Sequence, residues 1–358
     1  MAIEREEYAA RRERLAAALE ERGIDALFVQ PSSDLEYLTG LERDLPSFGS
    51  LSYAHGWVAG AFLAPGREPL FVLPRMVVQF HLGGEAPDGA VVVREDDDGR
   101  TLFAQAIETL GAPARVAVGA RTWAETVLEL RRTLPNAELV EGTSLVNELR
   151  RVKSAPELEL MGRGCAIARD AMEGTVARVE PGVTMADLVE EVEHRLRLLG
   201  SRCPSFPTHI FTWGERRLDS GDATAATPLA EGEAVLFDFG AVVEGYCSDF
   251  GRTVSCGDPP AGFDEARATM LAAQEAGRAA AVPGALACEV NAACRAPIEE
   301  AGLGSGFRHR MGHGIGLDVH ERPFLSVEDE TPLEVGMTFT DEPSILVDGS
   351  FGVRVEDV

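Results

Sequence analysis

The chain has 358 residues, more than one typical domain, and its 45% hydrophobic and 26% charged content favours a folded protein over a disordered one. Its 33 basic and 59 acidic residues give a net charge of −26, which repels phosphate backbones and anionic lipids, so we expect neither nucleic acid nor membrane as a partner. Most of the acidic excess is expected to be solvated surface, but this charge also suits metal ions held by carboxylates.

Helix and strand patterns alternate over residues 1–151, which predicts an α/β domain. The predicted helices cover residues 4–22, 102–110 and 123–134, and the predicted strands cover 25–30, 60–64, 69–74, 90–93, 116–118 and 137–140. The first helix is charged and lacks the apolar stretch of a signal peptide, and no 18-residue apolar run occurs in the chain, so we expect a cytoplasmic protein.

A charged segment that ends in a proline, residues 146–156, places the domain boundary near Val152 and gives domains 1–151 and 152–358. The predicted helices of the second domain form two pairs, 157–179 with 184–199 and 263–281 with 287–301. A strand-rich stretch follows each pair, 234–254 and then 312–358, which predicts an α+β domain with two similar halves. Thr184 and Asp187 have the spacing of an N-terminal capping box. The six cysteines form no CxxC pair and are expected to be reduced.

The first strand-rich stretch has a turn signal at Glu244 and Gly245, which predicts a hairpin. A loop of two or four residues centred between Val243 and Glu244 would place Asp238 directly opposite Asp249, on the same side of the hairpin. Like charges in that arrangement are destabilising unless a divalent cation lies between them.

The second stretch has its turn signal at residues 348–350. A three-residue loop there would place Glu342 directly opposite Glu356, so a second hairpin presents a second facing pair of carboxylates. Two such pairs, each with its own register, indicate a common metal site more strongly than either pair alone.

Three of the seven histidines lie in residues 307–321, among glycines that suggest a backbone in close approach to a ligand. The histidines are His309, His313 and His320, and the glycines are Gly312, Gly314 and Gly316. A phosphate-binding loop is rejected, because the spacing fits neither of the glycine-rich phosphate patterns and no lysine follows.

Four carboxylates and one imidazole form an oxygen-rich ligand set, which suits a pair of Mn²⁺, Co²⁺, Fe²⁺ or Zn²⁺ ions better than a cysteine-bound structural zinc. The set is Asp238, Asp249, His313, Glu342 and Glu356. Two ions bridged by carboxylates also bridge and acidify a water, which gives a hydroxide nucleophile at neutral pH and polarises a carbonyl. The sequence therefore predicts a hydrolase with two divalent metal ions per chain.

The motifs around these residues resemble those of the creatinase/methionine aminopeptidase family, which has the "pita-bread" fold, and within it the Xaa-Pro dipeptidases (prolidases) and aminopeptidases P. The motifs are LFDFG (236–240), GYCSDFGRT (245–253), GHGIGLDVHE (312–321), DEP (341–343) and GVRVED (352–357), with LRRVKS (149–154) between the domains. The resemblance covers nearly the whole chain. It implies a creatinase-like α/β N-terminal domain, an α+β pita-bread catalytic domain, and a homodimer that acts on small peptides.

The resemblance also implies roles for the ligand set. Asp238 would chelate one ion, His313 and Glu342 would chelate the other, and Asp249 and Glu356 would bridge both, with Mn²⁺ as the leading candidate metal. Glu342 would also be catalytic, as the proton shuttle for the attacking water.

Three further residues receive roles from the same resemblance. His320 would be a catalytic group that hydrogen-bonds the substrate and the developing gem-diolate. His309 would line the site of the leaving proline, in catalysis and substrate binding. Arg354 alternates with Glu356 on one strand face, so it would orient the bridging carboxylates and contact the substrate.

One departure from the family concerns a histidine that relatives carry near the position of Gly221, where this chain has Asp219 and Asp222 as candidate replacements. The departure bears on the substrate more than on the metal. A dipeptidase must also hold the free carboxylate of the leaving proline, which needs a local positive group. The candidates for that group are His309, Arg216, Arg217 and Arg310.

The leading interpretation is therefore a metal-dependent proline dipeptidase. An aminopeptidase P-like exopeptidase remains open, as does a hydrolase or lyase of the same fold that acts on a non-peptide C–N bond, like creatinase or ectoine hydrolase. The missing histidine favours such a change of substrate. A non-catalytic binding module is the remaining alternative, and the presence of all five metal-ligand residues argues against it.

Overall fold

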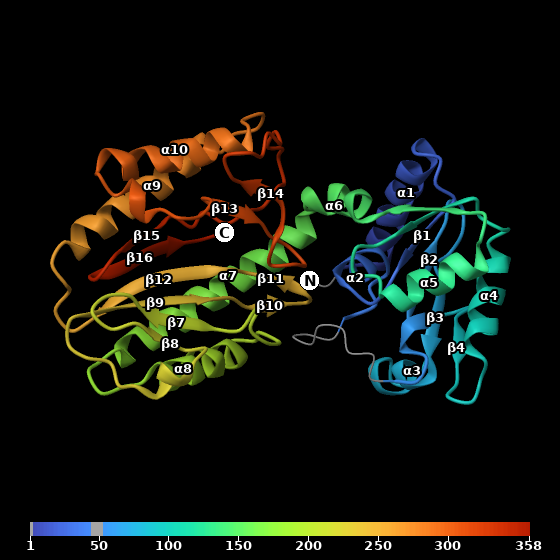
Figure 1. The fold of residues 1–358 in the computed structure, drawn as a ribbon, viewed down its shortest axis with the longest axis horizontal. Helices are drawn as coiled ribbons and strands as arrows, with labels where there is room; N and C mark the ends of the chain where they lie inside the picture. The colour runs from blue at the N-terminus through green and yellow to red at the C-terminus, as the bar shows by residue number, and fades with distance from the viewer. Residues whose placement is uncertain (1–2, 44–52) are drawn as a thin grey trace. The chain divides into compact units, whose positions relative to one another are not determined.

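The computed structural model describes residues 3–43 and 53–358, and their contacts divide them into two compact units, Ile3–Arg150 and Arg151–Val358 (Figure 1). Each unit has its own six-stranded sheet. Among the residues described, no helix is both long and apolar enough to cross a membrane.

The unit Ile3–Arg150 is built on a mixed sheet with the strand order β4-β3-β2-β1-β5-β6. Its strands are β1 (Ala26–Val29), β2 (Gly60–Leu63), β3 (Leu70–Pro74), β4 (Val91–Val93), β5 (Arg115–Val118) and β6 (Glu138–Glu141). Its helices are α1 (Arg5–Glu21), α2 (Ser33–Thr39), α3 (Arg75–His81), α4 (Gly99–Thr109), α5 (Ala124–Thr133) and α6 (Thr143–Arg151). Strands β5 and β6 are parallel because α5 provides the crossover between them. The rings of Phe28, Phe62 and Phe103 meet in the core, with centroids 4.7 to 5.8 Å apart.

The unit Arg151–Val358 has an antiparallel sheet with the strand order β15-β16-β12-β9-β7-β8. These strands are β7 (His209–Thr212), β8 (Leu218–Asp219), β9 (Glu233–Phe239), β12 (Phe250–Cys256), β15 (Ser344–Val347) and β16 (Phe351–Glu356). Two short ribbons accompany the sheet, and they pair β10 (Val242–Val243) with β11 (Tyr246–Cys247) and β13 (Gly312–Gly314) with β14 (Glu321–Leu325).

Two helix pairs divide this unit into the two similar halves that the sequence predicts. The helices are α7 (Ala155–Thr175), α8 (Met185–Leu198), α9 (Phe263–Ala280) and α10 (Ala287–Glu300). The first pair shares one core with β7 and β9, represented by Ala168, Leu188 and Phe237. The second pair shares another with β15 and β16, represented by Val290 and Val353. Apolar residues of β9 and β16 face these cores, so the residues that alternate with them lie on the opposite face of the sheet.

All of the predicted helices are present, and so are the predicted strands of the N-terminal unit. The predicted capping box begins α8, where Thr184 Oγ1 accepts a hydrogen bond of 3.1 Å from the backbone N–H of Asp187. The helix predicted at 157–179 is shorter than expected, because α7 ends at Thr175 and a 3₁₀ turn follows at Val176–Arg178. The sequence analysis missed α2, α3, β7 and β8, which are too short to show a clear period. It also missed α6, most of which lies in the charged segment predicted at the domain boundary.

Candidate metal centre and active site

The hairpin that carries Asp238 and Asp249 has a different register from the predicted one. Its loop is centred on Glu244 and Gly245, whose φ angles are 48° and 82°, because a two-residue turn of this kind needs left-handed backbone at both positions. Strands β9 and β12 therefore pair Asp238 with Gly251, and not with Asp249. The error is an even number of residues, so both acids still lie on one face, as diagonal neighbours.

The second hairpin has the predicted register. Ser344 of β15 pairs with Arg354 of β16, and an isolated bridge joins Asp341 to Asp357. Glu342 and Glu356 lie between these two pairs and therefore face each other, as predicted. The three-residue loop contains Gly349, whose φ of 73° is the left-handed conformation that such loops require.

His313 lies in β13, which the backbone of residues 338–342 flanks. Its backbone N–H donates to Thr340 Oγ1 at 3.0 Å, and its carbonyl accepts from the N–H of Thr340 at 2.8 Å. The ring Nδ1 is 3.1 Å from the carbonyl oxygen of Gly314. A carbonyl only accepts, so Nδ1 carries the proton, and Nε2 is left with the lone pair that a metal ligand needs.

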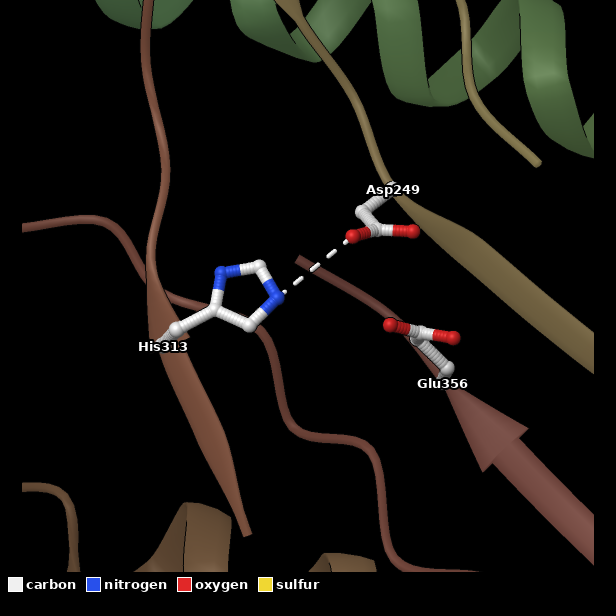
Figure 2. A group of neighbouring side chains, drawn as sticks. All are labelled: Asp249, His313 and Glu356. Carbon is white, nitrogen blue, oxygen red and sulfur yellow. Dashed lines mark ion pairs between the residues drawn. The ribbon is translucent and has the colours of Figure 1, made fainter. Parts of the chain in front are cut away.

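Three buried side chains from separate strands and loops converge at one point (Figure 2). Ligand atoms of Asp249, His313 and Glu356 all lie within 4.8 Å of one another, and Nε2 of His313 is 3.6 Å from Oδ2 of Asp249. Oδ1 of Asp249 and Oε2 of Glu356 are buried and accept no hydrogen bond from the residues described. Buried oxygens are rarely left in this state, so these atoms fit a cation.

The charges of the cluster indicate the same kind of ligand. Burial raises the pKa of Glu356 well above its usual value, and the neighbouring carboxylates of Asp249 and Asp238 raise it further. The pKa of Asp249 is raised in the same way, by burial and then by Asp238 and Glu342. Burial lowers the pKa of His313 to about 3, so its imidazole is neutral. A divalent cation offsets the repulsion among these carboxylates and binds the neutral imidazole.

The other two predicted ligands lie at the edge of this cluster. Oε1 of Glu342 is 3.4 Å from Nε2 of His313 and 3.3 Å from the hydroxyl of Thr340. Asp238 forms an ion pair with Arg354, whose guanidinium nitrogen is also 3.7 Å from Glu356 Oε2. Burial opposes the charge of Arg354, but Glu356 and Asp238 raise its pKa above the usual value. Arg354 thus contacts one acid of each hairpin, and its role in orienting them stays a prediction.

The two other predicted histidines flank the cluster. The centroid of the His320 ring is 4.1 Å from that of His313, and burial lowers the pKa of His320. His309 donates from Nδ1 to the carbonyl of Arg310 at 2.6 Å and pairs through Nε2 with the hydroxyl of Ser344. Burial lowers the pKa of His309 to about 4, so this imidazole is also neutral at physiological pH.

A cavity of about 230 Å³ opens on the same face of the sheet as the cluster. The register sets Asp219, Phe211 and Leu236 side by side across β8, β7 and β9, and all three line the cavity. The other lining residues are Trp213, Arg217, Gly306, Arg308, His309, Ser344, Leu346 and Arg354. Arg354 lines the cavity and also contacts Asp238 and Glu356, so the cavity adjoins the cluster, although none of the five predicted metal-ligand residues lines it.

The candidates for a positive group in this cavity differ in their surroundings. Arg216 is held by both oxygens of Glu233, each at 2.9 Å, and does not line the cavity, so its predicted role is not supported. Arg310 lies over the ring of Phe324 at 4.9 Å. Arg217 lines the cavity, with its guanidinium carbon 4.6 Å from the ring centre of Trp213. Asp222 caps a 3₁₀ helix at Ala223–Ala226 and does not line the cavity.

The glycines around His313 allow close packing within the protein, a role that the sequence analysis did not predict. A Cβ at Gly312 would lie 1.8 Å from the carbonyl oxygen of Thr340, and one at Gly314 would lie 2.5 Å from that of Arg322. A Cβ at Gly316 would lie 2.9 Å from both Glu321 and Lys153. The absent side chains therefore let neighbouring backbone and side chains approach β13.

Two residues near the site were missed. Thr340 is fully buried and contacts both His313 and Glu342; its place two residues before Glu342, on the same side of an extended chain, was the available signal. His209 of β7 pairs directly with Asp238, so it lies on the same face of the sheet. Because β7 was not predicted, no register could connect them.

Comparison with known proteins identifies both units. The model of metallopeptidase family M24 matches residues 159–358, and that of the creatinase/prolidase N-terminal domain matches residues 11–152. The chain is 29% identical to the Xaa-Pro dipeptidase of Pyrococcus furiosus, over 97% of this chain and 93% of that one. The solved structure of dipeptidase PepE from Mycobacterium ulcerans is 32% identical, with a TM-score of 0.83 over 99% of this chain and 93% of that one. The X-Pro aminopeptidase from Thermotoga maritima is 25% identical, with a TM-score of 0.80 over 96% and 93% of the two chains.

These similarities extend over both units and confirm the predicted creatinase-like N-terminal domain and pita-bread catalytic domain. The residues that converge around His313 lie inside the matched peptidase region. The chain therefore belongs to metallopeptidase family M24.

Proposed function

We propose that this protein is a metal-dependent Xaa-Pro dipeptidase, which hydrolyses the bond between an N-terminal residue and a C-terminal proline. The observation that carries the proposal is that the buried carboxylate–histidine cluster and the neighbouring cavity share Arg354, which contacts Asp238 and Glu356 and lines the cavity. A peptidase needs a metal centre at the scissile carbonyl and, next to it, an enclosed place for the leaving residue.

The proposed metal centre holds two divalent ions, with Mn²⁺ as the leading candidate. Asp238, Asp249, His313, Glu342 and Glu356 would hold these ions, with Asp249 and Glu356 shared between them. The orphaned oxygens of Asp249 and Glu356 support their part in this assignment. The ions supply Lewis acidity, which polarises a peptide carbonyl and makes water more acidic.

The remaining chemistry belongs to side chains of the protein. Glu342, held by the Thr340 hydroxyl, takes a proton from the attacking water and passes it to the leaving nitrogen. His320, beside the ring of His313, donates a hydrogen bond to the carbonyl oxygen as negative charge develops there. His309 is neutral and pairs with Ser344, so it lines the site of the leaving proline without adding a charge.

The free carboxylate of the leaving proline distinguishes a dipeptide from a longer substrate. We assign its recognition to Arg217, because this arginine lines the cavity and lies against Trp213. Arg308 also lines the cavity, but it forms an ion pair of 2.8 Å with Asp348. A guanidinium–carboxylate contact of this kind selects for a chain that ends at proline.

A substrate panel tests the proposal. Protein loaded with Mn²⁺ is assayed with Ala-Pro, Ala-Ala, a Xaa-Pro tripeptide and creatine, and Ala-Pro is expected to have the highest kcat/KM. Faster cleavage of the tripeptide assigns the protein to the aminopeptidase class. Hydrolysis of creatine alone assigns it to the non-peptide hydrolases, and no turnover of any of the four contradicts the proposal.

We also propose a cytoplasmic homodimer. The six cysteines lie among the residues described and form no disulfide there, which suits a reducing compartment. The homodimer rests on the family resemblance, and light scattering of the purified protein tests it directly.

A further inference from the structure

A buried ion pair lies next to the loop that carries His320. Nζ of Lys153, the only lysine of the chain, is 3.1 Å from Oε2 of Glu321, and the two side chains are 2% and 6% exposed. Both residues belong to the unit Arg151–Val358. Removing two charges from water costs free energy, and the attraction between them often does no more than offset that cost. A net gain in stability is therefore a weak explanation for such a pair.

The carboxylate of Glu321 closes the loop of residues 315–320. Its Oε1 accepts a hydrogen bond of 3.0 Å from the backbone N–H of Asp318, whose carbonyl accepts one of 3.0 Å from Gly316. Gly316 packs directly on the ion pair, since a Cβ there would lie 2.9 Å from Glu321 Oε1 and from Lys153 Cε. The loop therefore rests on Glu321, and Glu321 is held by Lys153.

Both ends of this arrangement are fixed to other parts of the unit. The backbone N–H of Lys153 donates to the carbonyl of Gly336 at 2.8 Å, and Val152 forms an isolated bridge with Met337. On the other side, the N–H of Cys247 donates to the carbonyl of Gly316 at 2.7 Å. Cys247 precedes Asp249 by two residues, so the loop is tied to the hairpin that supplies a metal-ligand residue.

We propose that Lys153 is a positioning residue, which acts through Glu321 to hold His320 beside the metal centre. His320 directly precedes Glu321 in the chain, and its ring lies 4.1 Å from that of His313. A misplacement of about 1 Å at a reacting group can lower the rate about 100-fold. The proposal rests on the function proposed for His320.

The first test replaces the charged pair. Lys153→Met is expected to lower kcat for Ala-Pro about 10-fold or more, with KM and metal content unchanged, because the loop loses its support. This variant also leaves a buried carboxylate without its cation and is destabilised. The double variant Lys153→Met/Glu321→Gln removes both charges, so it regains thermal stability but keeps the low kcat. The control is Arg151→Met, two residues before Lys153 in the chain. It breaks the half-exposed ion pair of Arg151 with Glu334 and is expected to leave kcat unchanged.

The second test asks whether the effect passes through His320. In a His320→Ala background, Lys153→Met is expected to cause no further loss of kcat, because there is no imidazole left to position. Equal losses in both backgrounds overturn the proposal, as does a wild-type kcat in the charge-free double variant.

A third measurement needs no substrate. Hydrogen–deuterium exchange of the peptide that covers residues 315–321 is expected to be faster in Lys153→Met than in wild type, with unchanged exchange in Arg151→Met. Unaltered exchange of this peptide in Lys153→Met overturns the proposal even when no substrate is known. Failure of the wild type to cleave any Xaa-Pro peptide contradicts the proposed function instead, and the two failures are thus distinguishable.

Discussion

The two hairpins of the catalytic unit bring their acidic residues together in different ways. In the second hairpin, Glu342 and Glu356 face each other directly, and both are buried. In the first, Asp238 and Asp249 are diagonal neighbours, and only Asp249 is buried. A direct cross-strand pair is therefore not required. The acids need only share one face of the sheet. A shift of the strand register by an even number of residues keeps them on that face, and a shift by an odd number does not.

A single glycine joins the two hairpins. Gly251 of β12 is directly opposite Asp238 on one side and directly opposite Glu356 on the other. A Cβ at this position would lie 2.5 Å from Oε2 of Glu356. Because Gly251 has no side chain, the acids of the two hairpins can approach each other at this position.

The largest expected effect compares one acid from each hairpin. Glu356→Ala is expected to abolish turnover and the binding of both ions, because its carboxylate would be shared by the two. Asp238→Ala removes a ligand of one ion only, so one ion per chain remains bound. The fold of metal-free Glu356→Ala survives, since burial and neighbouring carboxylates raise the pKa of Glu356 and its removal relieves repulsion. Metal titration and thermal unfolding check this; near-full activity of Glu356→Ala contradicts it.

The next effect separates the hairpins from the histidine loop. His320→Ala is expected to lower kcat for Ala-Pro about 100-fold or more while metal content stays at the wild-type level, as in the loss of an oxyanion donor. Steady-state kinetics and metal analysis of the same preparation measure both quantities. A parallel loss of bound metal would identify His320 as a metal ligand, so that its role would not differ from that of the hairpin acids.

A smaller effect concerns the cavity beside the second hairpin. Arg217→Ala is expected to raise KM for Ala-Pro roughly 10- to 100-fold and to change KM for a Xaa-Pro tripeptide much less, because a charge-assisted contact contributes about 1.5–3 kcal/mol. Arg216→Ala is the matched control, since Arg216 is engaged with Glu233 outside the cavity. Equal changes on both substrates argue against carboxylate recognition by Arg217.

The smallest effect tests the glycine between the hairpins. Gly251→Ala is expected to weaken metal binding about 10-fold, since a crowded methyl group displaces the Glu356 carboxylate at a cost of about 1–3 kcal/mol. Gly162→Ala on α7 is the control, because a Cβ there meets no atom within 4 Å. Calorimetric titration of both variants with Mn²⁺ checks the difference, and equal affinities show that Gly251 is not needed to bring the acids together.

The sequence predicted the acids of the site better than it predicted their pairing. Hairpin turn signals and alternating side chains placed all four acids on hairpins, because these are local features. The centre of the first loop was wrong by one residue, because the loop was centred between Val243 and Glu244 and not on the turn signal itself, Glu244 and Gly245, where it forms. The second loop contains Gly349 in the position that needs positive φ, and there the register was predicted correctly.

Contacts between distant segments could not be predicted in this way. The pairing of His209 with Asp238 depends on β7, a strand of four residues, and the cavity depends on Asp219 of the two-residue strand β8. Likewise, the contact of Lys153 with Glu321 joins residues that only the folded unit brings together. Short elements and long-range side-chain contacts carry little local signal.

The most direct test of the account is the metal content of the wild-type protein. Protein purified without added metal, stripped with a chelator and then titrated with Mn²⁺, is expected to bind two ions per chain, and Glu356→Ala is expected to bind neither. Binding that is absent in the wild type, or unchanged in Glu356→Ala, would contradict the assignment of the buried cluster of Asp249, His313 and Glu356 as a metal centre.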